Sequence, residues 1–465
     1  MSDGEPCHAS IAQLSNCFAE GTLSPVEVTH AHLERITRLN PALEAYTTVL
    51  TDNALADARR AERELRCGES RGPLHGVPIA VKDLCFTQGA ATTAGMVIYR
   101  NFIPTYDATV VSRLRRSGAV LIGKLNMCEA AGGEYHPDLP AVVNPWNAGY
   151  WAGASSSGSA VATAAGLCTA SLGSDTGGSI RTPCTMNGVT GLKPTWGRVS
   201  VYGSFAMAPS LDTLGPIARN AEDCGHVLAA IAGPDANDPT AVTAQVPDYT
   251  ANPPEVRRVR IGFDSEAILD TVEPAVAQVV REALGVFEGL GADLREVTLP
   301  SPTALATAWG TYTGAEAAVV HERTFPSRST DYGPFIRGLL EVGHTSSGMD
   351  IARIGHQRRV FAGQLAALFE DLDLLIVPAL PLADLTRERF TQLLFNPDDL
   401  PNVFRFTAPY NFSGNPTITL PGGFDSHGVP VGFQLVACHL NEPLLVAAGR
   451  AFQGATDWHL RRPPC

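Results

Sequence analysis

Two serine clusters and one lysine are the residues of this chain whose types and spacing could do covalent chemistry. The clusters are Ser155–Ser157 and Ser179, and Ser155 lies 24 positions before Ser179. Both lie among glycines and other small residues, where the backbone can approach a ligand closely. A serine hydroxyl is a weak nucleophile until a neighbouring base takes its proton. Lys82 follows the apolar run Val77–Val81, and burial at a strand end would favour its neutral, basic amine.

The string Asp175–Ser179 (DTGGS) could supply the second requirement of such chemistry, a site for developing negative charge. Its glycines can aim successive backbone N–H groups into a small concave nest. Fixed donors of this kind stabilise the oxygen of a tetrahedral acyl intermediate, and each donor raises the reaction rate by about 10²–10³-fold. Taken alone, each signal has a plain alternative. DTGGS could be a serine-capped turn, and Lys82 could be a surface lysine paired with Asp83.

The elements that must position these residues alternate between strands and helices, which favours an α/β fold with a mixed sheet. Before the serine clusters the pattern begins with a capping box at Ser24–Glu27. Strands are expected at 77–81, 119–123, 168–172, 259–263, 297–299, 374–377 and 417–420. Helices are expected at 52–66, 109–117, 157–167 and 273–290, and one is expected to open at Ser179 and to be broken by Pro183 and Gly188.

One elaborate domain is favoured over two independent ones. The polar, proline-bearing segment 235–254 predicts a surface connection rather than a linker between domains. We expect a helical N-terminal region at about 1–70 and a catalytic core at about 71–235. A variable, substrate-shaping region at about 236–420 follows, and the chain then returns to the core at 421–465.

Composition excludes several classes of function. The net charge of −13 disfavours nucleic acid as a main partner. The N-terminus lacks a secretory signal pattern, no apolar run is long enough to span a membrane, and the ten cysteines contain no CxxC pair. These features predict a cytoplasmic protein. No HExxH, paired Cys/His, GxGxxG or GxxxxGK[ST] motif occurs, so we expect no metal and no organic cofactor.

Taken together, the chain resembles the amidase signature family of serine hydrolases. The resemblance rests on Lys82, Ser155 and Ser179 within the strings GASSSGS and DTGGSIR. It extends through four further segments and so covers nearly the whole chain. These are GPLHGVPIAVKD (72–83), GLKPTWGRVSVYG (191–203), LDTLGPIARNAED (211–223) and PVGFQLV (430–436). It implies the fold of that family, a single large α/β domain whose twisted mixed sheet carries helices on both faces.

The resemblance also implies residue roles. Ser179 would be the nucleophile, Lys82 the base, and Ser155 a bridging serine that follows a cis peptide bond. The oxyanion hole would be formed by backbone N–H groups, and two charged residues would support its loop. The N–H donors are those of Thr176, Gly177, Gly178 and Ser179, and the supporting residues are Asp175 and Arg181. The chain departs from the family string at Ala154 and Ser157, which replace two glycines.

The implied activity is hydrolysis of a carboxylic amide through an acyl-enzyme, with esters and carbamates (urethanes) as further small-molecule substrates. A monomer or homodimer is expected. Segments 134–151, 309–335 and 390–412, which contain aromatic residues, are expected to shape the substrate pocket. The first alternative is the glutaminase-type subunit of a tRNA-dependent amidotransferase, which is similar in GRVSVYG. Others are a Ser-His-Asp hydrolase using His75 or His136, and a binding protein that kept the fold without activity.

Overall fold

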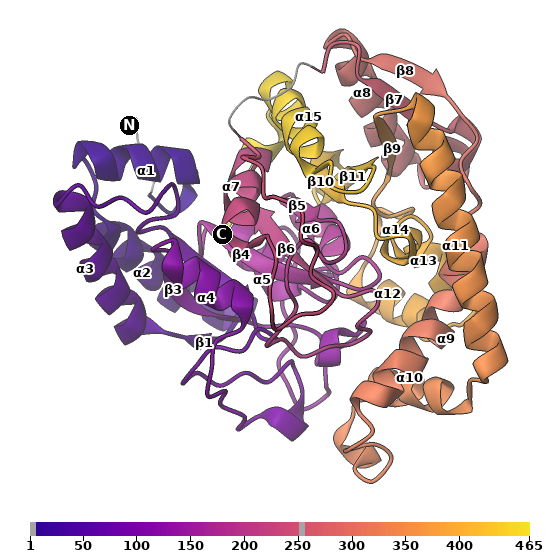
Figure 1. Ribbon diagram of the computed structural model, residues 1–465, viewed down its shortest axis with the longest axis horizontal. Helices are drawn as coiled ribbons and strands as arrows, with labels where there is room; N and C mark the ends of the chain where they lie inside the picture. Colours follow the sequence, from indigo (N-terminus) through magenta and orange to yellow (C-terminus); the bar gives the residue numbers. More distant parts are fainter. Residues whose placement is uncertain (1–5, 251–255) are drawn as a thin grey trace.

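One β-sheet runs through the whole computed structural model, which describes residues 6–250 and 256–465 (Figure 1). Its eleven strands, counted over the described residues, lie in the order β1-β3-β2-β4-β6-β5-β10-β11-β9-β7-β8. The strands are β1 (Tyr46–Val49), β2 (Pro78–Lys82), β3 (Val120–Leu125), β4 (Ala170–Asp175), β5 (Thr190–Lys193), β6 (Thr213–Ala218), β7 (Arg260–Phe263), β8 (Asp293–Glu296), β9 (Leu374–Pro378), β10 (Thr417–Phe424) and β11 (Pro430–Ala437).

The sheet is mixed, as expected. Strand β2 pairs in parallel with both β3 and β4, and β7 pairs in parallel with β8 and β9. The strands between these two groups, from β6 to β11, are antiparallel to their neighbours. Because β2 and β4 are parallel neighbours, their carboxyl ends lie at the same edge of the sheet. This edge carries the residues that follow both strands.

Helices cover both faces of the sheet. The α-helices are α1 (Ile11–Glu20), α2 (Pro25–Leu43), α3 (Thr51–Arg66), α4 (Thr109–Arg116), α5 (Ser157–Ala164), α6 (Arg181–Asn187), α7 (Ala221–Ile231), α8 (Pro274–Gly289), α9 (Thr303–Val320), α10 (Pro334–Thr345), α11 (Gly348–Asp371), α12 (Arg387–Leu394), α13 (Leu400–Phe404), α14 (Ala408–Ser413) and α15 (Glu442–Ala455). Gly449 of α15 packs against Ile418, and Gly191 of β5, which lies opposite Thr419, packs against α6. Successive residues of a strand face opposite sides, so α15 and α6 lie on opposite faces.

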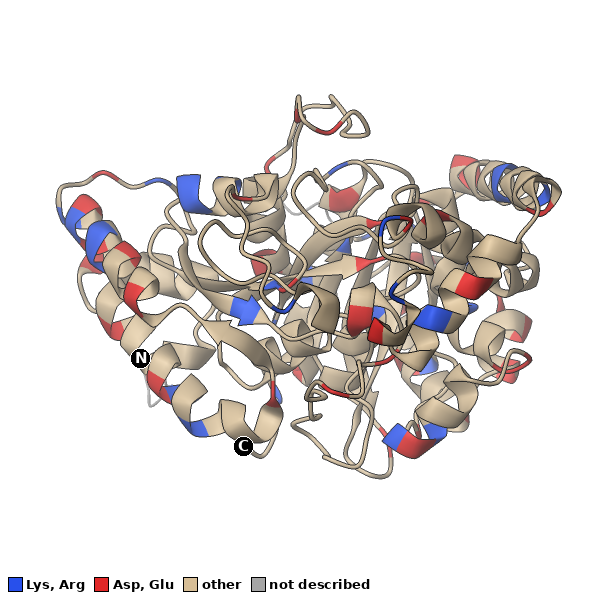
Figure 2. Ribbon diagram, turned by 90° about the horizontal axis from the view of Figure 1, so that it is seen from below, with Lys and Arg blue, Asp and Glu red and all other residues tan. Residues whose placement is uncertain are grey.

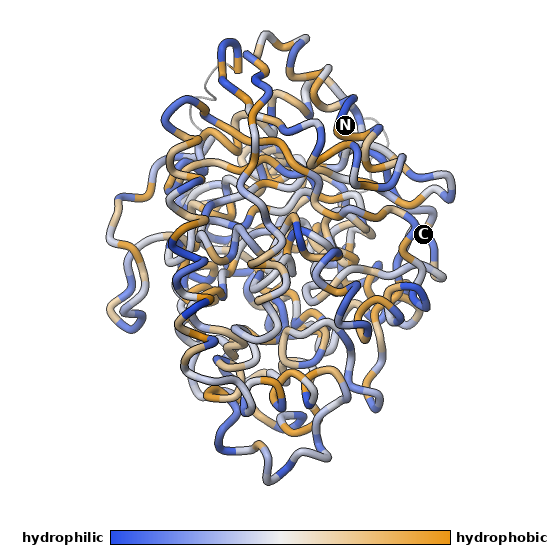
Figure 3. Tube along the Cα trace, turned by 90° about the vertical axis from the view of Figure 1, so that its right-hand side faces the viewer, coloured by the Kyte–Doolittle hydropathy of each residue, from blue (hydrophilic) through white to orange (hydrophobic). Residues whose placement is uncertain are grey.

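The core follows from the burial of the strands. The side chains of β2, β3, β4 and β9 are buried along their whole length, and β2, β3 and β9 are largely apolar in sequence. Charged residues lie mainly on the outer helices and loops (Figure 2), and apolar segments concentrate inside the molecule (Figure 3). No helix within the described ranges is long and apolar enough to cross a membrane.

Most expected elements are confirmed, including the capping box of α2 at Ser24, but several boundaries differ. Helix α5 ends at Ala164 instead of 167, β4 spans 170–175 instead of 168–172, and α6 begins at Arg181 instead of Ser179. Strand β8 precedes the apolar residues 297–299, because its register is set by parallel pairing with β7. Pro421 lies inside β10, where a register shift accommodates it. Pro183 lies in the first turn of α6, where a missing N–H costs no intrahelical bond. In the connection expected at 235–254, residues 235–250 have no regular element, and 251–255 lie outside the described residues.

Candidate active site

Lys82 is the last residue of β2, and its fully buried side chain is surrounded by hydroxyl groups. Its Nζ lies 2.7 Å from Ser155 Oγ, 2.9 Å from Ser156 Oγ and 2.8 Å from Ser174 Oγ. Burial lowers the pKa of Lys82 to about 7, because the charged form loses its hydration. At neutral pH, Lys82 is therefore a neutral amine in a large fraction of the molecules, and this amine can accept a proton from a serine hydroxyl.

The alternative interpretation of Lys82, a surface lysine paired with Asp83, is wrong. Asp83 lies 3.3 Å from Lys124 Nζ and accepts hydrogen bonds from the N–H and the hydroxyl of Thr93. Adjacent residues at a strand end point in opposite directions, so Asp83 and Lys82 have separate surroundings. Among the described residues, the hydrogen bonds of Lys82 Nζ are to serine hydroxyl groups and not to a carboxylate that would hold it in its charged form.

The hydroxyl groups around Lys82 restrict how its amine can be oriented. Ser156 Oγ donates to the Ser174 carbonyl (3.0 Å) and accepts the Ser174 N–H (3.1 Å). A hydroxyl has one hydrogen to donate, so the contact between Ser156 and Lys82 must use a hydrogen of the amine. A neutral amine has two hydrogens and one lone pair. When these hydrogens point to Ser156 and Ser174, the lone pair faces Ser155.

Ser155 follows a cis peptide bond, Ala154–Ser155, as the family resemblance implied. The Ala154 carbonyl accepts a hydrogen bond from Thr182 Oγ1 at 2.7 Å. The next N–H, that of Ser156, donates to the Ser179 carbonyl at 3.2 Å. These two contacts bring the serine clusters together, although they are far apart in the sequence. The methyl group of Ala154 is accommodated in this arrangement.

Ser179 lies in the turn between β4 and α6, and it is accessible. Every other residue from 170 to 187 is buried, whereas Ser179 is partly exposed. The two preceding glycines are required by their surroundings. A Cβ on Gly177 would lie 2.6 Å from Trp309 Nε1, and Gly178 has a φ of +136°, which other residues rarely adopt. The tight turn therefore presents one hydroxyl group to an incoming molecule.

The carbonyl groups of this turn are held by side chains from distant parts of the chain. Each of three successive carbonyls accepts one such hydrogen bond, so the turn is fixed from outside. The pairs are Asn411 Nδ2 to Asp175 (3.1 Å), Trp309 Nε1 to Thr176 (3.1 Å) and Thr407 Oγ1 to Gly177 (2.6 Å). Asn411 and Thr407 were not predicted from the sequence, and no local pattern distinguishes them.

The N–H groups of the turn divide into two kinds. Within residues 6–250 and 256–465, the N–H groups of Thr176, Gly177 and Ser179 have no hydrogen-bond acceptor. They remain available to a ligand oxygen. The N–H of Gly178 differs from the expectation, because it donates to Asp175 Oδ1 at 2.8 Å. Gly178 therefore shapes the turn, and its N–H is already occupied.

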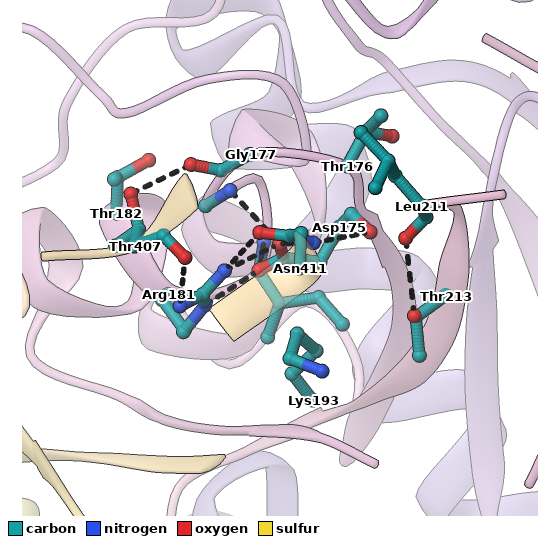
Figure 4. Close-up of polar contacts among 12 residues, drawn as sticks. Asp175, Thr176, Gly177, Arg181, Thr182, Lys193, Leu211, Thr213, Thr407 and Asn411 are labelled. Carbon is teal, nitrogen blue, oxygen red and sulfur yellow. Dashed lines mark hydrogen bonds and ion pairs between the residues drawn. The ribbon is translucent and has the colours of Figure 1, made fainter. Parts of the chain in front are cut away.

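Asp175 and Arg181 form the buried centre of the network behind the turn (Figure 4). Arg181 Nη2 lies 2.8 Å from Asp175 Oδ1, and it also donates to Asn411 Oδ1 at 2.6 Å. Burial by itself would raise the pKa of Asp175, but the Arg181 guanidinium outweighs it and holds the pKa well below its usual range. Lys193, drawn below this pair in Figure 4, is also fully buried, and burial lowers its pKa to about 7.

Rival chemistries gain no support from the histidines. His75 Nε2 lies 2.9 Å from Glu64, and His136 Nδ1 accepts the N–H of Asp138 at 3.1 Å. Both side chains thus have local partners and contact none of the serines discussed above. Over the part of the chain that the structure describes, no group of three or more His, Cys, Asp or Glu residues could hold a metal ion.

Two of the three segments expected to shape a pocket contact the Ser179 turn directly. Segment 309–335 does so through Trp309 of α9, and segment 390–412 does so through Thr407 and Asn411. Segment 134–151 is irregular, and its Trp151 stacks on Phe390 with ring centroids 3.6 Å apart. These segments are therefore packed against the site or against each other.

Comparisons with known proteins place this geometry in a family. The amidase family model matches residues 27–446. The chain is 44% identical to AmiD of Mycobacterium tuberculosis, provisionally named an amidase, over 98% of this chain and 95% of that protein. It is also 36% identical to one of the subunits of the glutamyl-tRNA(Gln) amidotransferase of Geobacter sp. strain M21, over 98% of this chain and 99% of the relative.

A solved structure agrees with these sequence matches. The native peptide amidase of Stenotrophomonas maltophilia superposes with a TM-score of 0.85 at 32% identity, over 98% of each chain. Agreement in sequence and fold over nearly the whole length supports an enzyme that acts on carbon–nitrogen bonds. The chain is a member of the amidase (amidase signature) family.

Proposed function

We propose that the protein hydrolyses carboxylic amides of small molecules through an acyl-enzyme on Ser179. The observation that carries this proposal is the contact of 2.7 Å between the buried Lys82 Nζ and Ser155 Oγ, beside an accessible Ser179. The N–H of Ser156, the residue after Ser155, donates to the Ser179 carbonyl at 3.2 Å, which supports a position of Ser179 close to the Lys82–Ser155 pair. We also propose that the protein is cytoplasmic and that it is a monomer or a homodimer.

The first step is nucleophilic attack on the amide carbonyl. The neutral amine of Lys82 takes the hydroxyl proton of Ser155, and Ser155 takes the hydroxyl proton of Ser179. At the same time, Ser179 Oγ forms a bond to the carbonyl carbon of the substrate. The carbonyl oxygen gains negative charge and faces the N–H groups of Thr176, Gly177 and Ser179, which are free to donate. Gly178 takes no part in this oxyanion hole, because Asp175 already accepts its N–H.

The second half of the cycle releases both products. The relay returns the proton from Lys82 through Ser155 to the leaving amine, and the carbon–nitrogen bond breaks. Water then attacks the ester on Ser179, the same two residues remove its proton, and the carboxylic acid leaves as Ser179 regains its hydrogen. Because the hole recognises a carbonyl oxygen, esters and carbamates are proposed as further substrates. No metal or organic cofactor enters any step.

A substrate panel tests this proposal. Anilides, aliphatic amides, esters and carbamates are incubated with the wild type, with Ser179→Ala and with Ser159→Ala. Ser159 is a matched control, since its buried hydroxyl donates to the Leu172 carbonyl (2.9 Å) and contacts neither Lys82 nor Ser155. Amide hydrolysis should be retained in Ser159→Ala and lost in Ser179→Ala. Hydrolysis at the wild-type rate by Ser179→Ala would refute the proposed nucleophile.

The second candidate is the glutaminase-type subunit of a tRNA-dependent amidotransferase. This candidate is supported by the 36% identity between the chain and an amidotransferase subunit, over 98% of the chain. This function predicts glutamine turnover and copurification with two other subunits. Efficient hydrolysis of a simple amide by the isolated chain, together with no glutaminase activity, would exclude it.

A further inference from the structure

A cavity of about 540 Å³ lies where elements from both ends of the chain meet. It is bounded by the short helix η1 (Pro6–His8), the start of α1, the start of α7, the end of α15 and the short helix η6 (Trp458–Leu460). Neither Lys82, Ser155 nor Ser179 lines it. Its volume is in the range of small-molecule sites.

The charged groups that line this cavity have an excess of positive charge. They are Arg219, Arg450, Arg462 and Glu222. Glu222 pairs with Arg450 at 3.1 Å, so these two neutralise each other. Arg219 donates to the carbonyls of Ala9 (2.7 Å), Thr163 (3.4 Å) and Cys168 (3.5 Å), none of which carries a charge. Over residues 6–250 and 256–465, Arg462 has neither a hydrogen bond nor an ion pair. Two guanidinium charges are thus left in a protein whose net charge is −13.

The nearest carboxylate behind Arg219 offsets this charge in part. Asp223 accepts hydrogen bonds from the N–H of Ile11 (3.0 Å) and from Asn220 Nδ2 (2.9 Å), and it does not line the cavity. Burial raises the pKa of Asp223 to about 7, so it carries only part of its negative charge at neutral pH. The cavity therefore stays positive at neutral pH.

The imidazoles of His8 and His459 belong to the cavity wall. Within the described residues their Nδ1 atoms have no hydrogen-bond partner, but both atoms are closed off from solvent, so they do not face the open cavity. The pKa of His8 is lowered to about 3 by burial and by the charges of Arg219, Arg462 and Arg35. His8 is thus neutral at neutral pH and adds no charge to the cavity.

We propose that this cavity is a binding site for a small molecule that carries a phosphate group. Arg219 and Arg462 would meet a doubly charged oxyanion, because guanidinium groups bind phosphate oxygens through paired N–H donors. The volume leaves room beyond one phosphate group, which favours a phosphate monoester over the free ion. This inference is independent of the proposed amide hydrolysis.

Isothermal titration tests the site with inorganic phosphate and glycerol 3-phosphate as probes, and with acetate at matched ionic strength as control. The wild type should bind both phosphates at one site and acetate at least tenfold more weakly. Arg462→Ala should weaken phosphate binding by about tenfold or more. Arg461→Ala is the matched variant, since Arg461 pairs with Asp457 (2.8 Å) and does not line the cavity. It should bind within twofold of the wild type.

The outcomes separate the possibilities. Tighter binding of glycerol 3-phosphate than of phosphate assigns an organic ligand, and equal binding assigns the free ion. Because Arg219 also holds the Ala9 carbonyl, Arg462 is the residue that is substituted, and circular dichroism verifies the fold of each variant. No phosphate-specific heat up to 20 mM of probe (roughly the weakest useful affinity) would overturn the proposal. Equal losses in Arg461→Ala and Arg462→Ala, or equal binding of acetate, would overturn it as well.

Discussion

The hydroxyl group of Ser156 should set the pH at which Lys82 becomes active, although Ser156 is no member of the proposed relay. Its Oγ lies 2.9 Å from Lys82 Nζ and can only accept there, because its own hydrogen binds the Ser174 carbonyl. An acceptor stabilises the ammonium form more than the neutral amine. Removing it in Ser156→Ala should therefore lower the pKa of Lys82 below about 7.

The size of the shift follows from the strength of one hydrogen bond. A bond to a charged group contributes about 1.5–3 kcal/mol and a neutral one about 0.5–1.5 kcal/mol. The difference of about 1 kcal/mol corresponds to about 0.7 of a pKa unit. The amine also loses one of the contacts that direct its lone pair to Ser155, so the plateau rate should fall by about tenfold, or ~1.4 kcal/mol.

The assay is the pH dependence of kcat/KM for the fastest amide substrate. In the wild type, kcat/KM should rise about tenfold per pH unit below about 7 and level off above it, as Lys82 loses its proton. In Ser156→Ala the same curve should have its midpoint about 0.7 of a unit lower. Ser159→Ala should keep the wild-type midpoint. A midpoint that stays in place or moves upward in Ser156→Ala contradicts the proposed orientation of the amine.

Three further substitutions have defined outcomes. Lys82→Met should lower kcat/KM by about 10²–10⁴ without recovery between pH 6 and 10, and near-normal activity would place the base elsewhere. Trp309→Phe removes the bond to the Thr176 carbonyl (3.1 Å), so kcat should fall by about 3–10-fold with little change in KM. Glu129 is buried beside the Gly333 N–H (2.9 Å), and burial raises its pKa to about 7. Its folded pKa is raised, so its contribution to stability is present below about pH 4.5 and is lost as the pH rises through about 7. At pH 8, the free energy of unfolding of Glu129→Gln should thus be larger than that of the wild type by up to about 3 kcal/mol. Urea titrations should show this difference decreasing as the pH is lowered toward 4.5. An equal gap at both pH values would show that the charge of Glu129 is unimportant.

The sequence predicted the parts of the site that depend on local pattern. An apolar run that ends at Lys82 is a buried strand with a polar end, and β2 has this form. Small residues around Ser155 and Ser179 indicated that the backbone could approach a ligand closely there, and Ser179 is a partly exposed residue of a tight turn. The mixed α/β sheet followed from the alternation of strand and helix signals.

The remaining parts depend on how distant segments meet. Ser174 reaches Lys82 because β4 pairs in parallel with β2, and a sequence does not state which strands are neighbours. Trp309, Thr407 and Asn411 fix the turn from more than 130 positions away, so no local spacing reveals them. The loss of Gly178 as an oxyanion donor has the same origin. Only the folded geometry shows that Asp175 turns back to accept its N–H.

Trapping the acyl-enzyme tests the central claim most directly. The fastest ester of the substrate panel is mixed with the enzyme, quenched with acid within one turnover, and the protein is digested and sequenced by mass spectrometry. The acyl group is predicted on Ser179 in the wild type and on no residue in Ser179→Ala. An acyl group on Ser155, or rapid hydrolysis with unmodified Ser179 at every quench time, would contradict the account.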